Sequence, residues 1–386
     1  MRGGRPHALS PARPIAIDVV EEGRRMANIC NACRYCEGYC AVFPALERRL
    51  SFNEGDLAYL ANLCHDCGAC YYACQYAPPH EFQLNFPKMM GEIRAATYSK
   101  YAWPELLSAL FKRNGLAVSL ITAACLVLFV LGMGVGVDRQ TLLSAHPDSD
   151  GAFYAVLSHR AMVWTFGAAF ALAIVALMIA SVRFWRDVGE DPGSFLTARP
   201  LAQSIDAVLR LKYLRGGGDG CTYSDDRPSP ERRAYHQITF YGFLLCFAAT
   251  CVATVYHYAL GYHAPYPLWS LPTLLGTVGG IALLIGPAGL LGLKARRDAA
   301  LADAKQTGMD VGFLVLLLLV SGTGLLLLAL RQSAGMGIVL AVHLGVVMAF
   351  FITLPYGKFV HAVYRFTALV RYHVERRRPL PELGPE

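Results

Sequence analysis

Eight of the twelve cysteines fall into two short runs with the same spacing. Residues 30–40 read Cys-Asn-Ala-Cys-Arg-Tyr-Cys-Glu-Gly-Tyr-Cys, and residues 64–74 read Cys-His-Asp-Cys-Gly-Ala-Cys-Tyr-Tyr-Ala-Cys. Gaps of two and three residues are too short for regular disulfide pairing. Both runs are C-x2-C-x2-C-x3-C, the pattern with which bacterial ferredoxins bind iron–sulfur clusters. The spacing therefore predicts metal chemistry and, specifically, [4Fe-4S] clusters.

The pattern also predicts which thiolates share a cluster. Three cysteines on one loop hold three corners of a cubane, and the fourth, at the start of a helix, binds the other cluster. Cluster one is then held by Cys30, Cys33, Cys36 and Cys74, and cluster two by Cys64, Cys67, Cys70 and Cys40. Structural zinc is the alternative, but zinc sites usually have two cysteine pairs with a longer spacer. The prediction is a short electron wire without substrate chemistry of its own.

Four histidines lie at or within apolar stretches of the chain: His236, His257, His343 and His361. Ionisable side chains are costly inside a bilayer, so such histidines are candidates for function. At 1.5 Å per helical residue, His236 and His257 are about 31 Å apart along the chain, and His343 and His361 are about 27 Å apart. If the two helices run antiparallel, His236 faces His361 near one membrane surface and His257 faces His343 near the other.

Two bis-histidine b haems would satisfy all four imidazoles, although one haem is the more secure prediction. The alternative is that each histidine only forms hydrogen bonds at the membrane interface. His159 competes with His257 as an outer ligand. Cys221, on a polar loop, has no role that the sequence explains.

The segments that carry these residues suit two different environments, water for the cysteine runs and lipid for the apolar stretches. The chain is 55% hydrophobic and 16% charged, against about 25% charged residues in soluble proteins. Helices of around 20 residues cross a hydrocarbon core, and six stretches qualify: 115–136, 160–182, 237–259, 270–292, 311–330 and 337–360. Glycines in the fourth favour close helix contact. The predicted fold is an α-helical integral membrane bundle of six transmembrane helices with an N-terminal ferredoxin-like 2[4Fe-4S] domain.

The same patterns divide the chain into segments. They are a disordered tail (1–25), the cluster domain (26–112), transmembrane helices one and two (113–185), a cytoplasmic basic loop (186–235), transmembrane helices three to six with haem b (236–365) and a cytoplasmic tail (366–386).

Basic residues predict the orientation, because cytoplasmic loops are enriched in Lys and Arg. Nine of them lie from Arg183 to Arg233, whereas the opposite face has little beyond Arg139, Arg160 and Arg331. We expect a multi-pass protein of the bacterial inner (cytoplasmic) membrane with both termini and the clusters in the cytoplasm. The first 25 residues contain no secretory signal. The net charge of +7 follows from this topology, so nucleic acid is not an expected partner.

Three features resemble a known family, the tricarballylate and citrate utilisation protein B family. They are the paired cysteine runs, the segment 235–250 (Tyr-His-Gln-Ile-Thr-Phe-Tyr-Gly-Phe-Leu-Leu-Cys-Phe-Ala-Ala-Thr) and the segment 343–361, which ends Leu-Pro-Tyr-Gly-Lys-Phe-Val-His. The resemblance extends from about Ile29 to Arg377. The chain is also similar to the C-terminal half of a flavohaem protein of aerobic cobalamin synthesis.

The resemblance implies a partner and an acceptor. The partner is a soluble FAD dehydrogenase, whose flavin this type of protein reoxidises, and the acceptor is the quinone pool. The last span is more distantly similar to the haem b subunit of respiratory nitrate reductase, where one helix ligates two haems through histidines eighteen residues apart. His343 and His361 match that separation, but His236 and His257 lie farther apart than the histidines of the partner helix there.

These observations predict a membrane electron-transfer subunit that passes electrons from the dehydrogenase through two [4Fe-4S] clusters and haem b to quinone. Chemistry on the organic acid belongs to the partner, so the chain need not be an enzyme by itself. The alternative is an iron–sulfur redox-sensing or regulatory domain on a membrane anchor or transporter. A transporter predicts broken helices or buried acidic residues at mid-membrane, and a sensor on an anchor needs no intramembrane histidines.

Overall fold

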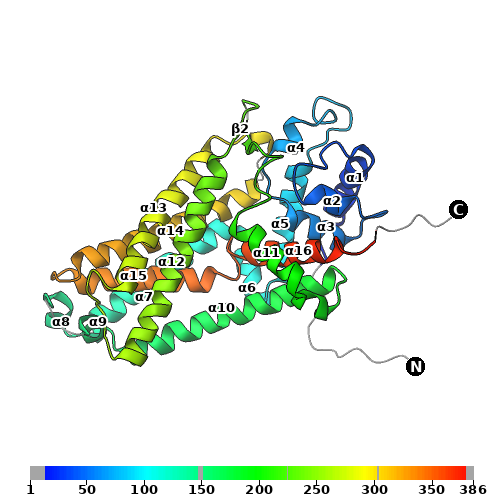
Figure 1. Ribbon diagram of the computed structural model, residues 1–386. Helices are drawn as coiled ribbons and strands as arrows, with labels where there is room; N and C mark the ends of the chain where they lie inside the picture. The colour runs from blue at the N-terminus through cyan, green and yellow to red at the C-terminus, as the bar shows by residue number, and fades with distance from the viewer. Residues whose placement is uncertain (1–13, 147–150, 224, 302–303, 380–386) are drawn as a thin grey trace, which may run out of the picture.

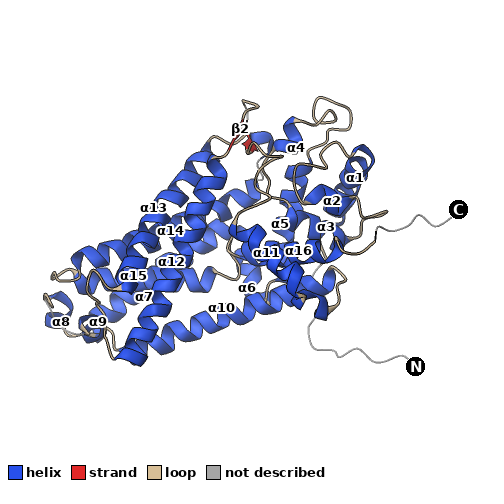
Figure 2. Ribbon diagram, in the orientation of Figure 1, coloured by secondary structure: helices blue, strands red, loops and turns tan. Residues whose placement is uncertain are grey.

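The computed structural model describes residues 14–146, 151–223, 225–301 and 304–379. Six of its helices are long and apolar enough to cross a membrane, which confirms the predicted spans. They are α7 (Asn114–Gly136), α10 (His159–Asp187), α12 (Glu231–Leu260), α13 (Leu271–Ala295), α14 (Ala304–Leu330) and α15 (Met336–Thr353). The spans pack side by side, and helix dominates the molecule throughout (Figures 1 and 2).

α15 is the central helix of the membrane bundle. It packs against α7, α10 and α14, and 61% of its apolar window is buried, against 28% or less for the other five spans. Those five expose large apolar side chains such as Leu131, Trp164 and Val278. In water such a surface would be unfavourable, whereas lipid tails solvate it.

Glycines hold α12 and α13 close together, as the composition of the fourth span predicts. A methyl group on Gly279 would lie 2.8 Å from the carbonyl oxygen of Gly242 and 2.8 Å from Sγ of Cys246. Only a residue without Cβ therefore allows this separation.

The cluster domain is built from five helices at one end of the bundle (Figure 1). They are α1 (Ile17–Cys33), α2 (Val42–Leu46), α3 (Glu54–Leu63), α4 (Ala69–Tyr72) and α5 (Phe86–Tyr101). α3 begins with a capping box, in which Asn53 and Asp56 satisfy each other's backbone N–H groups.

The prediction of a disordered tail over residues 1–25 is wrong from Ile17 onward, and residues 1–13 lie outside the described part. α1 forms because its spacing buries Gly23, Met26 and Ala27 on one face. Ile15 is also buried, at 6% exposure.

Shorter elements connect the spans. α6 (Glu105–Leu110) and η1 (Phe111–Arg113) lead into α7, while α8 (Arg139–Leu143) and α9 (Ala152–Val156) lie at the end of the bundle away from the cluster domain (Figure 1). On the cluster-domain side are η2 (Pro192–Leu196), α11 (Ala198–Leu209), the two-stranded antiparallel β1 (Cys221–Thr222) and β2 (Pro228–Ser229), and η3 (Ala299–Leu301).

The sixth span ends earlier than predicted. The sequence suggests one helix over 337–360, but α15 stops at Thr353 and α16 (Val360–Glu375) begins after a turn. Pro355 has no N–H to continue the helix. His343 and His361 therefore lie on different helices, so the likeness to one haem-binding helix of nitrate reductase fails.

The described parts of the predicted basic loop (186–223 and 225–235) and of the predicted C-terminal tail (366–379) are folded at the cluster-domain end. The loop is tied down where the N–H of Gly217 donates to the carbonyl of Tyr39, at 3.1 Å, and the N–H of Thr222 to that of Cys67, at 3.0 Å. Residues 366–375 continue α16, which packs on α3, α10 and α11. Glu375 is buried there in an ion pair with Arg49, at 2.8 Å.

Candidate functional site

Helix ends position the cysteines. Cys30 and Cys33 lie in the last turn of α1, and Cys64 is the residue after α3, where its N–H still bonds the carbonyl of Leu60. The spacing predicts the first three thiols of each run on a loop, so the helical position of Cys30 and Cys33 departs from that prediction.

The thiols of the two runs lie close together, and Cys70 of the second run neighbours thiols of both predicted clusters. A cavity of about 240 Å³ is lined by Cys30, Cys33, Cys36, Cys70 and Cys74. Burial raises the pKa of the Cys30 thiol, and the neighbouring thiols of Cys36, Cys74 and Cys33 raise it further. Cys74 thus lies with the first run, as the predicted exchange requires.

The second group gathers around the other fourth cysteine. Burial raises the pKa of Cys40 to about 12, with Cys64 as the next cause. Cys70 has Cys64 and Cys40 among its thiol neighbours, and Cys67 has Cys70 and Cys40. The arrangement matches the predicted set of Cys64, Cys67, Cys70 and Cys40. These ligand assignments stay predictions.

The spread of the thiols bears on the type of metal centre. Within the described residues, no three His, Cys, Asp or Glu side chains lie close enough together to hold one metal ion. A cubane presents a separate iron to each thiolate, so its ligands stand farther apart than the ligands of a single ion. The two groups therefore suit cubanes better than zinc.

Cys221 lies beside the second group. It is 2% exposed, and its thiol shares a hydrogen bond with the thiol of Cys67, beside Arg232. Sequence reasoning left Cys221 without a role, because only the folded basic loop carries β1 to the cluster domain.

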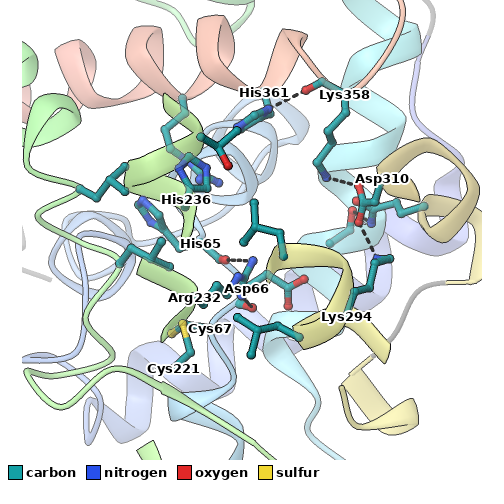
Figure 3. Close-up of a pocket in the computed structure, with 18 of the residues that line it drawn as sticks. His65, Asp66, Cys67, Cys221, Arg232, His236, Lys294, Asp310, Lys358 and His361 are labelled. Atoms are coloured by element: carbon teal, nitrogen blue, oxygen red, sulfur yellow. Dashed lines mark hydrogen bonds and ion pairs between the residues drawn. The ribbon is translucent and has the colours of Figure 1, made fainter. Parts of the chain in front are cut away.

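A larger cavity, of about 290 Å³, lies where the cluster domain meets the membrane bundle. His65, Asp66 and Cys67 line it from the predicted cluster-two loop, and His236 and His361 line it from α12 and α16 (Figure 3). Of the four predicted haem ligands, the inner pair thus faces the same cavity as a cluster loop.

His236 and His361 have the geometry that two ligands of one iron need. Their ring centroids are 6.0 Å apart, with planes at 86°. Metal–imidazole bonds are about 2 Å long, so two rings on one iron have centroids about 6 Å apart. The fold brings the two together from segments 125 residues apart in sequence.

Hydrogen bonding at Nδ1 leaves Nε2 of His361 free to bind a metal. Its Nδ1 lies 2.6 Å from the carbonyl oxygen of Lys358, so Nδ1 carries the proton and Nε2 keeps its lone pair, the usual arrangement of metal-binding histidines. Burial, followed by Lys358 and Arg365, holds the pKa of His361 well below its usual range. Nδ1 of His236 is buried without a partner among the described residues. These features are compatible with two neutral imidazole ligands, and a haem on His236 and His361 stays a prediction.

The outer histidines have different neighbours from those predicted. The ring of His257 stacks on that of His159, with centroids 3.8 Å apart, and lies 5.0 Å from that of His263. His343 instead approaches Thr323 of α14, where Nδ1 and Oγ1 are 3.0 Å apart. Among the described residues the ring contacts of His257 do not include His343, and the choice between His257 and His159 as an outer ligand stays a prediction.

Two arginines near the inner pair were not singled out from the sequence. Arg232 precedes His236 by four residues and Arg365 follows His361 by four. At this spacing each arginine lies on the same helix face as its histidine, a signal that could have been found beforehand. Both line the larger cavity.

The fold and the thiols together define a helical integral membrane protein with an N-terminal ferredoxin-like domain. The chain belongs to the citrate utilization protein B family. Its family model matches residues 109–382, and the model of the family's Fer4-like domain matches residues 23–100. The chain is 51% identical, over 360 residues, to citrate utilization protein B of Escherichia coli, covering 92% of this chain and 93% of that protein. No solved structure matches.

Proposed function

We propose that this chain is a membrane electron-transfer subunit that reoxidises a partner FAD dehydrogenase and delivers the electrons to quinone. Two [4Fe-4S] clusters and a b haem, when bound, supply the one-electron steps between the two-electron flavin and the quinone. The dehydrogenase carries out the chemistry on the organic acid, a tricarballylate- or citrate-like compound.

One observation carries this proposal: the predicted cluster-two loop and the inner histidine pair line a single cavity. Cys67 and His65 come from the loop, and His236 and His361 come from the helices. Consecutive redox centres must lie close together for electrons to pass, and a shared cavity brings the cluster-two loop and the histidine pair together. Cluster one, whose cavity is lined by neither His236 nor His361, is then the entry point.

The proposed orientation places the cluster domain in the cytoplasm of a bacterial inner membrane. Its support is the basic residues around that end, including Arg183 and Arg233, because cytoplasmic loops are enriched in Lys and Arg. Asp187, at the end of α10, is fixed to the domain by an ion pair with Lys100, at 2.6 Å. A soluble dehydrogenase would meet the domain on this side.

The inner haem is the better supported of the two that the sequence suggests. His236 and His361 face each other, whereas His343 and His257 contact different neighbours. A second haem on His257 and His343 stays a prediction from the sequence.

Metal and haem analysis tests the proposal. Purified chain should contain about eight non-haem irons, four per cubane, and show the sharp reduced bands of b haem. His236→Ala and His361→Ala should lose the same haem and keep the non-haem iron. His80→Ala, on the loop after α4 and outside both cavities, should keep both.

The same spectra decide against the competing function. A regulatory iron–sulfur domain on an anchor or transporter would contain iron but no haem bands, and substitution of His361 would change nothing in the spectrum. Haem content unchanged in both histidine variants would show the ligand assignment to be wrong.

A further inference from the structure

Three arginines donate hydrogen bonds to the backbone of the predicted cluster-two loop. Arg94 of α5 and Arg365 of α16 both bond the carbonyl of Cys64, at 2.7 and 2.6 Å. Arg232 of α12 bonds the carbonyls of Asp66 and His65, at 2.5 and 3.1 Å (Figure 3). The loop thus receives positive charge from three helices.

These charges are not cancelled by nearby carboxylates. Asp66 is the carboxylate of the loop, and it pairs with Arg297, at 2.7 Å, and with Arg94, at 3.6 Å. Asp310 is a second carboxylate near Arg94, but it is paired with Lys294 and Lys358, each at 2.7 Å. Among the described residues, neither Arg232 nor Arg365 forms an ion pair with a carboxylate. Arg94 is only 5% exposed, so its charge is weakly screened by solvent.

The surroundings of cluster one are different. Besides the thiols, its cavity is lined by aromatic and apolar residues and one amide: Tyr35, Phe43, Tyr71, Ala73, Gln75, Tyr76, Leu84 and Phe86. Among these described lining residues there is no charged side chain. The first run also contains Arg34 and Glu37, which have opposite charges and are both exposed. The two predicted clusters therefore differ in the buried positive charge beside them.

Charge near a cluster sets its reduction potential. Reduction adds one electron, and a nearby positive charge in a medium of low dielectric constant stabilises the added electron. We propose that Arg94, Arg232 and Arg365 hold cluster two at a higher reduction potential than cluster one, so that electron flow runs from cluster one to cluster two and on toward His236 and His361. This inference rests on the proposed function.

The electron balance is simple. A reduced flavin on the dehydrogenase supplies two electrons, one at a time. In each internal step cluster one loses one electron and cluster two gains it, without proton transfer at either cluster. The potential difference makes this step favourable in the direction of the membrane.

The arginines also connect the centres physically. Arg232 and Arg365 lie on the helices of the candidate haem ligands, four residues from His236 and His361, and both reach the backbone of the cluster-two loop. A conservative Lys keeps the charge but loses the forked hydrogen bonds. Charge and positioning can thus be separated by substitution.

A redox titration followed by electron paramagnetic resonance tests the inference. Full-length chain with its iron bound should show two one-electron waves. Cys67→Ser should lose one of them and Cys33→Ser the other, which assigns the waves even if one variant does not accumulate. The inference expects the higher wave to be that of cluster two.

The arginine variants then test the cause. Arg365→Gln and Arg94→Gln should each move the cluster-two wave to lower potential. The expected shift changes the equilibrium constant for electron transfer from cluster one to cluster two by at least about tenfold, which is 59 mV for a one-electron couple. Arg365→Lys, which keeps the positive charge, should have a cluster-two potential close to that of the natural chain. Arg25→Gln, an exposed arginine of the same domain paired with Glu22, should leave both waves unchanged.

The failures are distinguishable. Chain without iron would overturn the proposed function. Chain with both clusters, in which cluster one has the higher potential or the arginine variants move neither wave, would overturn this inference and leave the proposed function standing.

Discussion

At the scale of single residues, the cysteines separate into ligands and neighbours. Cys40 and Cys221 both lie beside the second group of thiols, but only Cys40 belongs to the repeated spacing. Cys40→Ala should lose about four of eight non-haem irons, because one cubane loses a ligand. Cys221→Ala should keep all of them, as measured by iron analysis of the purified chain. If Cys221→Ala lost iron and Cys40→Ala kept it, Cys221 would be the cluster ligand and Cys40 the neighbour.

A second prediction concerns Cys221 itself. Bound as a ligand, Cys67 is a thiolate, so the neighbouring Cys221 thiol donates its hydrogen bond to that sulfur. Hydrogen bonds to cluster sulfurs raise the reduction potential. Cys221→Ala should therefore lower the potential of cluster two, and Cys221→Ser, which keeps a donor, should lower it less. A redox titration with equal potentials in all three proteins would contradict this.

At the scale of elements, the close approach of α12 and α13 depends on one glycine more than on its neighbour. A methyl group at Gly279 would lie 2.8 Å from the Gly242 carbonyl, whereas one at Gly276 would meet Ala249 at an ordinary 3.7 Å. Overpacking of this kind costs about 1–3 kcal/mol. Thermal unfolding in detergent should show a lower Tm for Gly279→Ala and little change for Gly276→Ala. Equal Tm values for Gly279→Ala and Gly276→Ala would mean that α12 and α13 can move apart without loss of stability.

Packing between α11 and α16 should depend on pH through His373. Its Nδ1 lies 3.0 Å from Oγ of Ser204 and 2.9 Å from the Leu369 carbonyl, and burial holds its pKa below the ordinary value of 6.5. Lys212, Arg376 and Arg377 are the charged groups that face it. As the pH falls, the unfolded chain therefore takes up a proton at His373 before the folded chain does.

The sign follows from that difference. The contribution of His373 to stability is present above pH 6.5 and is lost as pH falls, by at most about 1.4 kcal/mol per pH unit. Denaturant unfolding at pH 7.5 and 5.5 should show a smaller loss in His373→Asn than in the natural chain. The same loss in both proteins would exclude His373 as the cause.

The sequence predicts the elements better than their ends. The six spans follow from apolar length alone, and the thiol grouping follows from the exchange of fourth cysteines. The break after Thr353 was missed because the apolar run continues through the turn at Pro355, and hydropathy does not register a missing N–H. The end of the disordered tail was misplaced because α1 buries only a narrow stripe, Gly23, Met26 and Ala27.

At the scale of the molecule, the least predictable feature is where the parts meet. The pairing of His236 with His361 could be argued from antiparallel helices, but the shared cavity could not. It depends on Arg232 and Arg365, whose bonds to the cluster-two loop join segments far apart in sequence. No periodicity in a single sequence specifies such contacts.

The cluster domain, the loop 186–235 and α16 together form one end of the molecule, and α7, α10 and α12–α15 form the membrane part (Figure 1). In the proposed function, electrons that enter at cluster one pass to cluster two and then to the His236–His361 pair. The account therefore requires that haem reduction depends on the clusters.

Stopped-flow spectroscopy measures that dependence most directly. Purified chain in lipid nanodiscs is mixed, without oxygen, with a reduced flavin dehydrogenase, and the reduced band of b haem is followed in the natural chain and in Cys33→Ala, at equal haem content. The account predicts that haem reduction in the variant is slower by more than about tenfold, a barrier increase of at least 1.4 kcal/mol. Equal rates in the two proteins would show that electrons reach the haem without the clusters and would contradict the account.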